Sequence, residues 1–243
     1  MSVARRTRGP SRARRPVFVP ASEGKQLVRE VELVFEWFPG FSIEQMQRSI
    51  GAMHLAAQEA GVSPVLEISS KSPSVFGAAL SAFRLRIRLP DGATTSVESA
   101  YQGSKIFRDA GGPWPEVYRL PSAEAKAFSR SHEKDAIRGF DFFGEPWPLT
   151  PMTAFYDWLY VTALSQDSGL EAKLSDFMGF SDIAFNPARS IACQARSAAM
   201  FVALAKRRAL PGALRSREAF LGAVSGASEA AEPRHSSGQQ SLF

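Results

Sequence analysis

The chain has 243 residues, of which 44% are hydrophobic and 11% aromatic, so it carries enough apolar material for a buried core and is not of the disordered class. Its formal net charge of +5 is uneven, because six arginines lie in the first fifteen residues, while the rest of the chain has 23 basic against 24 acidic side chains. Three interpretations of that basic start remain open: an arm that binds nucleic-acid phosphates, a solvated leader, or an extension with no role.

Composition also restricts the chemistry. The single Cys193 excludes an intramolecular disulfide framework, and three scattered histidines lack the spacing of metal ligands, so we predict neither a metal nor another cofactor. No apolar run approaches the ~18 residues of a membrane span, and the start of the chain lacks the apolar region of a secretory signal. We therefore expect a soluble, cytoplasmic protein with no membrane partner.

Strand signals dominate the first half of the chain, where β-branched and aromatic residues alternate with polar ones. They predict strands at residues 16–20, 26–38, 64–69 and 80–89. The first of these is bounded by prolines, which favours a sheet edge. Ser42 and Gln45 form a capping box before an amphipathic helix that ends near Gly61. Thr95 and Glu98 form a second capping box, which predicts a helix that continues to Lys105.

Helix signals dominate the second half. Residues 111–136 are predicted to form an ordered loop, and short strand or turn structure is expected at 137–149. Thr150 and Pro151 predict the N-cap and first residue of a helix. Its buried stripe is expected to comprise Phe155, Leu159 and Ala163. Further helices are predicted at about 170–177, 190–210 and 216–224.

This distribution predicts one α+β domain, mostly helical with a small mixed sheet. We place the domain at residues 16–224. A basic disordered tail (1–15) precedes it, and a disordered C-terminal tail (225–243) rich in Ser, Gly, Glu and Gln follows it.

The stretch ESAYQGSK, Glu98 to Lys105, puts a carboxylate, a phenol, an amide and an amine into eight residues. On a helix, Glu98, Gln102 and Lys105 lie along one face, with Tyr101 beside them. Two interpretations stay open at this point. Either Glu98 caps the helix, Lys105 is a solvated partner and Tyr101 is core, or the four side chains form a catalytic face.

Two other polar groups suggest chemistry. Asp157 lies in an otherwise aromatic segment, where a buried carboxylate needs a partner. Asn186, Arg189, Gln194 and Arg196 surround a predicted helix start, where backbone N–H groups and the helix dipole favour an anion. A structural role and a ligand role are equally open for each group.

Several separated blocks resemble a known family. ESAYQGSKIF is similar to the E-H-x-Y-Q-x-x-K-F signature of the NADAR superfamily, and residues 186–196 resemble its C-terminal G-x-N…L-M-x-x-R element. Together with SAFRL, FFGEPWPL and TAFYDWLY, these blocks resemble the NADAR antitoxins encoded beside DarT toxins, over about residues 15–222. The chain departs from the wider superfamily at Ser99 and Ala82, where that superfamily has histidine and asparagine.

The resemblance implies an ADP-ribosylglycohydrolase that cuts the N-glycosidic bond between ribose C1″ and a DNA base, guanine in this branch. Such an enzyme would reverse a DarT-like toxin, with ADP-ribosylated single-stranded DNA as substrate, ADP-ribose as product and the toxin as a further partner to test. The carboxylates would stabilise an oxocarbenium-like state, and the lysine would form a Schiff base. The implied catalytic residues are Lys105, Glu98 and Asp157. The implied substrate-binding residues are Tyr101, Gln102, Phe83, Trp158, Asn186, Arg189 and Arg196.

Further candidates are Trp147 for stacking on adenine and the face formed by Arg84, Arg86 and Arg88 for the DNA backbone. Two alternative functions stay open. One is an N-glycosidase of a nucleotide-like metabolite such as a ribosylamino-pyrimidine phosphate. The other is a non-catalytic protein that binds ADP-ribose or the toxin. Covalent catalysis through Lys105 and direct attack by water are not distinguished by the sequence.

Overall fold

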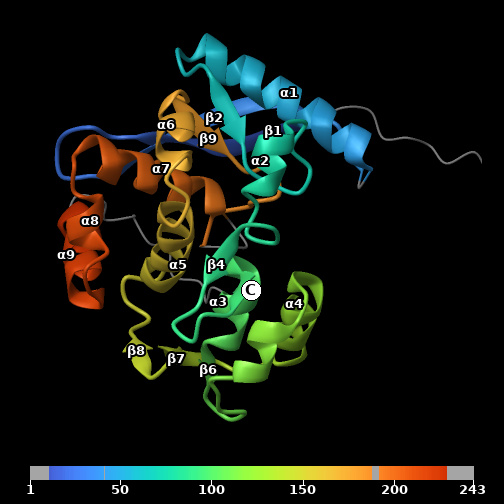
Figure 1. Cartoon of the computed structure of the whole chain (residues 1–243). Coiled ribbons are helices and arrows are strands. Elements are labelled where there is room, and N and C mark those ends of the chain that lie inside the picture. Colours follow the sequence, from blue (N-terminus) through green and yellow to red (C-terminus); the bar gives the residue numbers. More distant parts are fainter. Residues whose placement is uncertain (1–10, 41, 188–191, 229–243) are drawn as a thin grey trace, which may run out of the picture.

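The computed structural model describes residues 11–40, 42–187 and 192–228, with side chains up to Ser225. Helices and small sheets alternate along the chain, which confirms the predicted α+β class (Figure 1). The strands are β1 (Ser11–Pro20), β2 (Val28–Trp37), β3 (Val65–Glu67), β4 (Arg86–Arg88), β5 (Thr94–Ser96), β6 (Lys105–Phe107), β7 (Ile137–Phe142), β8 (Glu145–Trp147) and β9 (Gly179–Ser181).

Most of the helices are short. They are α1 (Ile43–Glu59), α2 (Val75–Ala79), α3 (Val97–Gly103), α4 (Ser122–Ser131), α5 (Ala154–Ser165), α6 (Leu170–Ser175), α7 (Gln194–Lys206), α8 (Leu210–Ala213) and α9 (Arg217–Ser228), with a 3-10 helix η1 (Pro115–Arg119). Among the described residues, none of these helices has the length and apolar character needed to cross a membrane.

The first sheet has the strand order β2-β1-β9-β3, with β3 and β9 parallel and the other pairs antiparallel. Strand β1 is therefore not at an edge, contrary to the expectation from its prolines. The unpredicted strand β9 pairs with it at Phe18, and Gly179 fits there because a Cβ would lie 2.8 Å from Val17. Strand β1 begins at Ser11, inside the segment expected to be a tail, and Arg14 on it pairs with Glu32 across the ladder at 3.1 Å.

Two apolar cores hold the molecule together. One forms where α1 packs on β1 and β2, and it buries Val17, Phe35, Ile50 and Met53. The larger one surrounds α5 and α7, which cross the middle of the molecule in Figure 1. The stripe predicted on α5 is confirmed, because Phe155, Leu159 and Ala163 are all buried. Helix α3 packs against α4, η1 and α5, so its polar side chains lie at the margin of this larger core.

Several predicted boundaries were wrong for local reasons. Only Arg86–Arg88 of the segment 80–89 forms a strand, because the Ser81 carbonyl accepts hydrogen bonds from the N–H groups of Arg84 and Leu85, at 2.8 Å each, and turns the chain. Arg84 therefore does not share the strand face of Arg86 and Arg88. Helix α5 starts at Ala154 with Thr153 as N-cap, three residues after the predicted Pro151.

The other helix predictions hold with shifted ends. Half of the capping box predicted for α1 is confirmed, since Ser42 Oγ accepts from the Gln45 N–H at 3.2 Å, but Gln45 Oε1 has no hydrogen-bond partner among the described residues. Helix α7 starts at Gln194 and ends at Lys206, and the predicted start at 190 lies outside the described residues. Helix α9 extends to Ser228, past the predicted domain end at 224. The remaining predicted tail residues, 1–10 and 229–243, also lie outside the described part.

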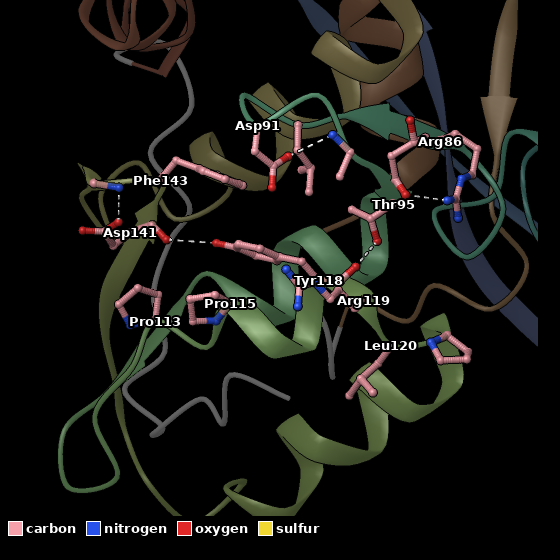
Figure 2. A pocket seen from close by; sticks show the side chains of 15 residues that line it. Arg86, Asp91, Thr95, Pro113, Pro115, Tyr118, Arg119, Leu120, Asp141 and Phe143 are labelled. Carbon is pink, nitrogen blue, oxygen red and sulfur yellow. Dashed lines mark hydrogen bonds between the residues drawn. The ribbon is translucent and has the colours of Figure 1, made fainter.

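A cavity of about 480 Å³ opens between the β4–β5 turn, η1 and the β7–β8 turn (Figure 2). Its wall includes Arg86, Tyr118, Arg119 and Phe143 but neither Glu98 nor Lys105. The candidate catalytic residues and this cavity are therefore separate features of the surface.

Candidate active site

Serine hydroxyls fix the start of helix α3 and its position against neighbouring segments. Its N-cap is Ser96, whose Oγ accepts from the Ser99 N–H at 3.0 Å, so the predicted capping residue Thr95 was off by one. Thr95 instead donates through Oγ1 to the Tyr118 carbonyl at 2.5 Å. Ser99, which replaces the histidine of the wider superfamily, is fully buried and donates to the Leu120 carbonyl at 2.8 Å. These bonds fix α3 against η1 and the segment that follows it.

Helix α3 ends at Gly103, so Lys105 is not on it, contrary to the predicted single helical face. A Cβ at Gly103 would lie 2.5 Å from the Tyr118 ring, and the glycine lets η1 pack against the end of the helix. Lys105 is the first residue of β6 and pairs with Phe140 of β7. Its Nζ nevertheless lies 5.1 Å from the centroid of the Tyr101 ring, so the strand also places the amine beside Tyr101.

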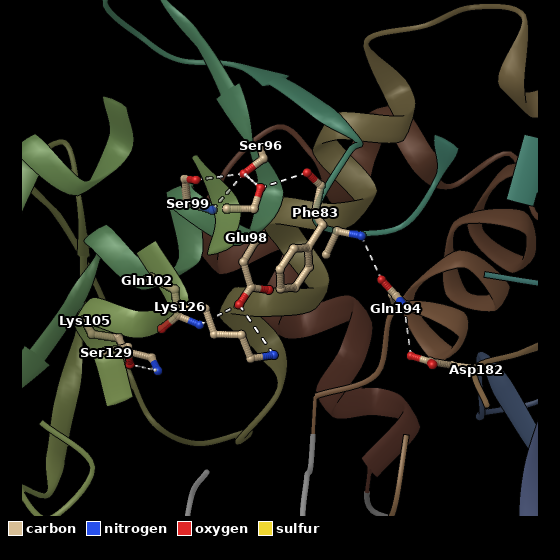
Figure 3. Close-up of polar contacts among 12 residues, drawn as sticks. Phe83, Ser96, Glu98, Ser99, Gln102, Lys105, Lys126, Ser129, Asp182 and Gln194 are labelled. Atoms are coloured by element: carbon tan, nitrogen blue, oxygen red, sulfur yellow. Dashed lines mark hydrogen bonds and ion pairs between the residues drawn. The ribbon is translucent and has the colours of Figure 1, made fainter. Parts of the chain in front are cut away.

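Glu98 is a buried carboxylate with incomplete pairing. Its exposed fraction is 6%, and Oε1 accepts from Gln102 Nε2 at 2.9 Å and lies 3.8 Å from Lys126 Nζ (Figure 3). Both contacts fall on Oε1, which leaves Oε2 without a hydrogen bond in the described part of the chain. Gln102 Oε1 is likewise buried with no hydrogen-bond partner among the described residues. Because buried polar atoms are normally paired, the unpaired Gln102 Oε1 is suited to accept a hydrogen bond from a ligand, and Glu98 Oε2 keeps acceptor capacity as well.

Lys105 is as buried as Glu98, at 6% exposed, and donates from Nζ to Ser129 Oγ of α4 at 2.8 Å. Burial lowers the pKa of Lys105 to about 8, with Lys126 adding to the effect and Glu98 opposing it. At pH 7, roughly one-tenth of the molecules then carry Lys105 in its neutral form. A neutral amine is the form that attacks an electrophilic carbon.

Asp157 on α5 is 1% exposed, and both of its oxygens are occupied. Oδ2 accepts from Arg196 Nη1 at 2.7 Å, and Oδ1 accepts from Ser197 Oγ at 2.6 Å. Two side chains of α7 are thus the partners that the sequence analysis expected a buried Asp157 to need. Asp157 also influences Tyr101. Burial raises the pKa of Tyr101, the charges of Glu98 and Asp157 raise it further, and the phenol therefore stays neutral.

The other predicted binding residues are dispersed. Phe83 lies on the turn before β4 and is 36% exposed, with Lys126 Nζ 5.2 Å from its ring centroid. Trp158 packs against the buried Trp147 at 4.9 Å between centroids, so these two rings belong to the apolar core. Asn186 lies in the loop between β9 and α7, and Arg189 falls outside the described residues.

Helix α4 supplies two residues that the sequence analysis missed, Lys126 and Ser129. The segment 111–136 was expected to be a loop, but residues 122–131 form a helix. A local signal was present, since Pro121 stands before a first turn that contains Glu124, a pattern typical of a helix start.

Gln194, expected at an anion site beside the start of its helix, instead holds the Phe83 turn in place. Its Oε1 accepts from the Ala82 N–H at 2.7 Å, while its Nε2 donates to the Asp182 carboxylate at 2.9 Å (Figure 3). The Ala82 carbonyl in turn accepts from the Glu98 N–H at 3.0 Å. Burial and the nearby Glu67 raise the pKa of Asp182 to about 7. No sequence signal joins residues this far apart in the chain.

The described residues contain no group of three or more His, Cys, Asp or Glu side chains arranged to hold a metal ion. What they do bring together is a carboxylate, an amide and an amine of lowered pKa. The fold is α+β, and this cluster combines hydrogen-bond acceptors with an amine, the side-chain types that acid–base and nucleophilic catalysis use.

The family model described as DarT1-associated NADAR antitoxin matches residues 13–234, and the chain belongs to this family. A search of curated proteins finds no significant match. The NADAR family is associated with glycohydrolase activity, and membership in this branch supports an antitoxin role with a DarT toxin as partner.

Proposed function

We propose that the protein is an ADP-ribosylglycohydrolase that removes ADP-ribose from a DNA base, guanine in the branch it resembles, and so reverses a DarT-type toxin. The observation that carries the proposal is the buried Lys105, with its pKa lowered to about 8, within electrostatic reach of the incompletely paired Glu98. Family membership supports the same class of reaction.

Glu98 is suited to stabilise the transition state. Breaking the bond between ribose C1″ and the base builds positive charge on the sugar, and a carboxylate beside it lowers the barrier. Glu98 Oε2, which accepts no hydrogen bond from the described residues, is available for this task. The unpartnered Gln102 Oε1 accepts a hydrogen bond from a ribose hydroxyl, and the neutral Tyr101 packs beside the sugar.

Lys105 is suited to act as the nucleophile. Its neutral Nζ forms a bond to C1″ while the bond from C1″ to the base breaks and the base leaves with the electron pair and takes up a proton. Opening of the ribose ring gives an imine on Lys105, which water hydrolyses to free ADP-ribose and the restored amine. Ser129 Oγ, 2.8 Å from Nζ, fixes the direction of the amine.

Residues further out would hold the diphosphate of ADP-ribose. Arg196 keeps N–H groups beyond those bound to Asp157 and Thr153, and its side chain is 31% exposed. Asn186 and Arg189, on the segment that leads into α7, remain predicted binding residues. Phe83 is the exposed ring nearest to Lys126 and is a candidate to stack on a base.

The test is release of ADP-ribose from an ADP-ribosylated single-stranded oligonucleotide by the full chain. We expect Lys105→Ala to abolish release and Glu98→Gln to lower it by roughly 10²- to 10³-fold, whereas Lys134→Ala, an exposed lysine beyond α4, leaves it unchanged. Borohydride should trap a covalent adduct with the unsubstituted protein but not with Lys105→Ala. Absence of an adduct despite full turnover would indicate direct attack by water.

Other outcomes would overturn the proposal. Full activity of both variants would show that the site is wrongly assigned. Turnover of ribosylamino-pyrimidine phosphates without action on modified DNA would indicate a metabolite glycosidase. Tight binding of ADP-ribose without turnover, or neutralisation of the toxin that survives Lys105→Ala, would indicate a binding protein.

A further inference from the structure

The cavity shown in Figure 2 is not used by the proposed chemistry. Its volume of about 480 Å³ is within the range of small-molecule sites, which is roughly 300–1,000 Å³. Its floor and sides combine aromatic, proline and leucine side chains with two arginines and two aspartates. A mixed lining of this kind is typical of a site for a planar polar ligand rather than of a packing defect, which would be apolar throughout.

An exposed aromatic ring stands at the edge of the cavity in an unfavourable backbone conformation. Phe143 has a φ of 55° and is 42% exposed, and its ring stacks on that of Tyr118 with 5.3 Å between centroids and 11° between planes. A residue other than glycine with this backbone costs about 1 kcal/mol, and asparagine tolerates it better than phenylalanine does. Phe143 is only partly buried, so part of the residue stays open to solvent. The ring is therefore placed where a second planar group has access to it.

The charged residues of the cavity present both donors and acceptors. Arg86 is fixed by a 2.7 Å bond from Nη2 to the Thr94 carbonyl, while Arg119 has no hydrogen bond or ion pair within the described part of the chain. Asp91 and Asp141 line the cavity, and each accepts one backbone N–H through Oδ1, from Ala93 and Gly144 respectively. Arginines pair with phosphates, and carboxylates accept from the exocyclic amino groups of bases.

The cavity shares a wall with the candidate active site. Ser104, the residue before Lys105, bonds through its carbonyl to the Asp141 N–H at 2.8 Å and through Oγ to the Tyr118 hydroxyl at 3.1 Å. Pro121 lines the cavity, and the next residue, Ser122, begins α4 and donates to the Phe83 carbonyl at 2.7 Å. A single thickness of chain thus lies between the two features, and one extended ligand can contact both.

We infer that this cavity binds an unmodified nucleotide of the same single-stranded DNA whose modified base lies at Glu98 and Lys105. The base of that nucleotide stacks on Phe143, its amino groups meet Asp91 or Asp141, and its phosphates meet Arg86 and Arg119. Stacking of bases on aromatic side chains beside a cationic groove is the usual way in which proteins hold single strands. The inference deepens the proposed function and rests on it for the identity of the strand.

The first experiment measures binding without catalysis. A short, unmodified, fluorescent single-stranded oligonucleotide is titrated with the full chain, and anisotropy gives the Kd. Because stacking on one ring contributes roughly a 5- to 100-fold gain in affinity, we expect Phe143→Asn to raise the Kd by that factor and Phe143→Tyr to restore it. Asparagine keeps the turn conformation, so the melting temperature of that variant should change by no more than a few degrees.

Arginine variants test the phosphate contact separately. Arg119→Ala should reduce the dependence of log K on log[salt] by about 0.7, the value for one phosphate contact on a single strand. Arg29→Ala, an exposed arginine on β2 outside the cavity, is the control of equal charge and should leave the slope unchanged. Equal slopes for the two variants would overturn the inference.

The second experiment compares turnover of an ADP-ribosylated oligonucleotide with that of an ADP-ribosylated nucleoside. Phe143→Asn should lower kcat/KM for the oligonucleotide only, since the nucleoside does not reach the cavity. Equal losses on both substrates, an unchanged Kd for DNA, or loss of toxin binding in place of DNA binding would each overturn the inference. A chain that binds DNA through Phe143 but releases no ADP-ribose would instead overturn the proposed function, so the two failures are distinguishable.

Discussion

Two buried carboxylates, Glu98 on α3 and Asp157 on α5, differ in how completely they are paired. Asp157 has both oxygens bound, one to Arg196 at 2.7 Å and one to Ser197 at 2.6 Å. Glu98 has one oxygen bound to an amide at 2.9 Å, and the nearest cation, Lys126, lies at 3.8 Å. The comparison teaches that two buried carboxylates can differ in unused acceptor capacity, and the proposed function requires that capacity at Glu98.

The elements that supply the partners explain the difference. Arg196 and Ser197 are adjacent on α7, which packs along α5, so the pair around Asp157 joins the two central helices of the larger core. Lys126 comes from α4, at the margin of the fold, and its side chain is 41% exposed. These contacts give Asp157 a structural role between α5 and α7, whereas Glu98 keeps the acceptor capacity that the proposed function requires.

The largest effect is expected at Asp157. Asp157→Ala leaves Arg196 partly buried without its partner, and breaking a buried pair from one side costs about 3–5 kcal/mol of unfolding free energy. Urea denaturation followed by circular dichroism measures this. The double variant Asp157→Leu with Arg196→Met should recover most of the loss, because it leaves no unpaired charge. A loss below about 1 kcal/mol in Asp157→Ala, the range of an exposed ion pair, would contradict the structural role.

Glu98→Gln should show the opposite pattern. The amide preserves size and a hydrogen bond to Gln102, so the free energy of unfolding should change by less than about 1 kcal/mol. The loss of negative charge beside the sugar should lower kcat by roughly 10²- to 10³-fold, the usual range for removing one electrostatic contact to a transition state. Denaturation and ADP-ribose release measured on the same preparation separate the two effects. A variant that unfolds as easily as Asp157→Ala would remove the distinction between the carboxylates.

Part of this site was predictable because it depends on local geometry. Glu98 and Gln102 are four residues apart, and the predicted shared helical face is confirmed by their 2.9 Å hydrogen bond. Lys105 reaches the same site, although the helix predicted there was wrong. Helix α3 ends at Gly103, against which Tyr118 packs closely. Lys105, in β6, then pairs with Phe140 of β7, and this pairing directs its amine toward the site. Its proximity to Tyr101 was predicted, but for an incorrect reason.

The remaining partners depend on long-range packing, which periodicity does not encode. Gln194 reaches the Ala82 N–H across 112 positions, and Ser129 reaches Lys105 across 24. The sequence showed that Asp157 needed a partner but not which one, since Arg196 was assigned to a ligand. The α+β class was predictable from the distribution of strand and helix signals, whereas β9 and α4 were missed because one is three residues long and the other follows a proline-rich segment.

The pH dependence of turnover tests Lys105 against its two charged neighbours. Because only the neutral amine attacks, kcat/KM should rise about tenfold per pH unit below the pKa of about 8 and level off above it. Glu98 raises this pKa and Lys126 lowers it. In Glu98→Gln the residual activity should therefore reach its plateau at a lower pH than in the unsubstituted protein. A pH-independent rate between 6 and 9 would contradict the role of Lys105 as a nucleophile.

The smallest effect is expected for Lys126→Ala. The 3.8 Å pair with Glu98 is half-exposed, and exposed pairs contribute about 0–1 kcal/mol, so the free energy of unfolding should barely change. Removing the lysine takes away one cation that lowers the pKa of Lys105, so the plateau of kcat/KM should move to higher pH, opposite to the shift in Glu98→Gln. A pH profile measured for both variants gives the two signs in one experiment. If the plateau of kcat/KM moves in the same direction in both variants, the group that titrates is not Lys105. Glu98 would then act on the substrate alone.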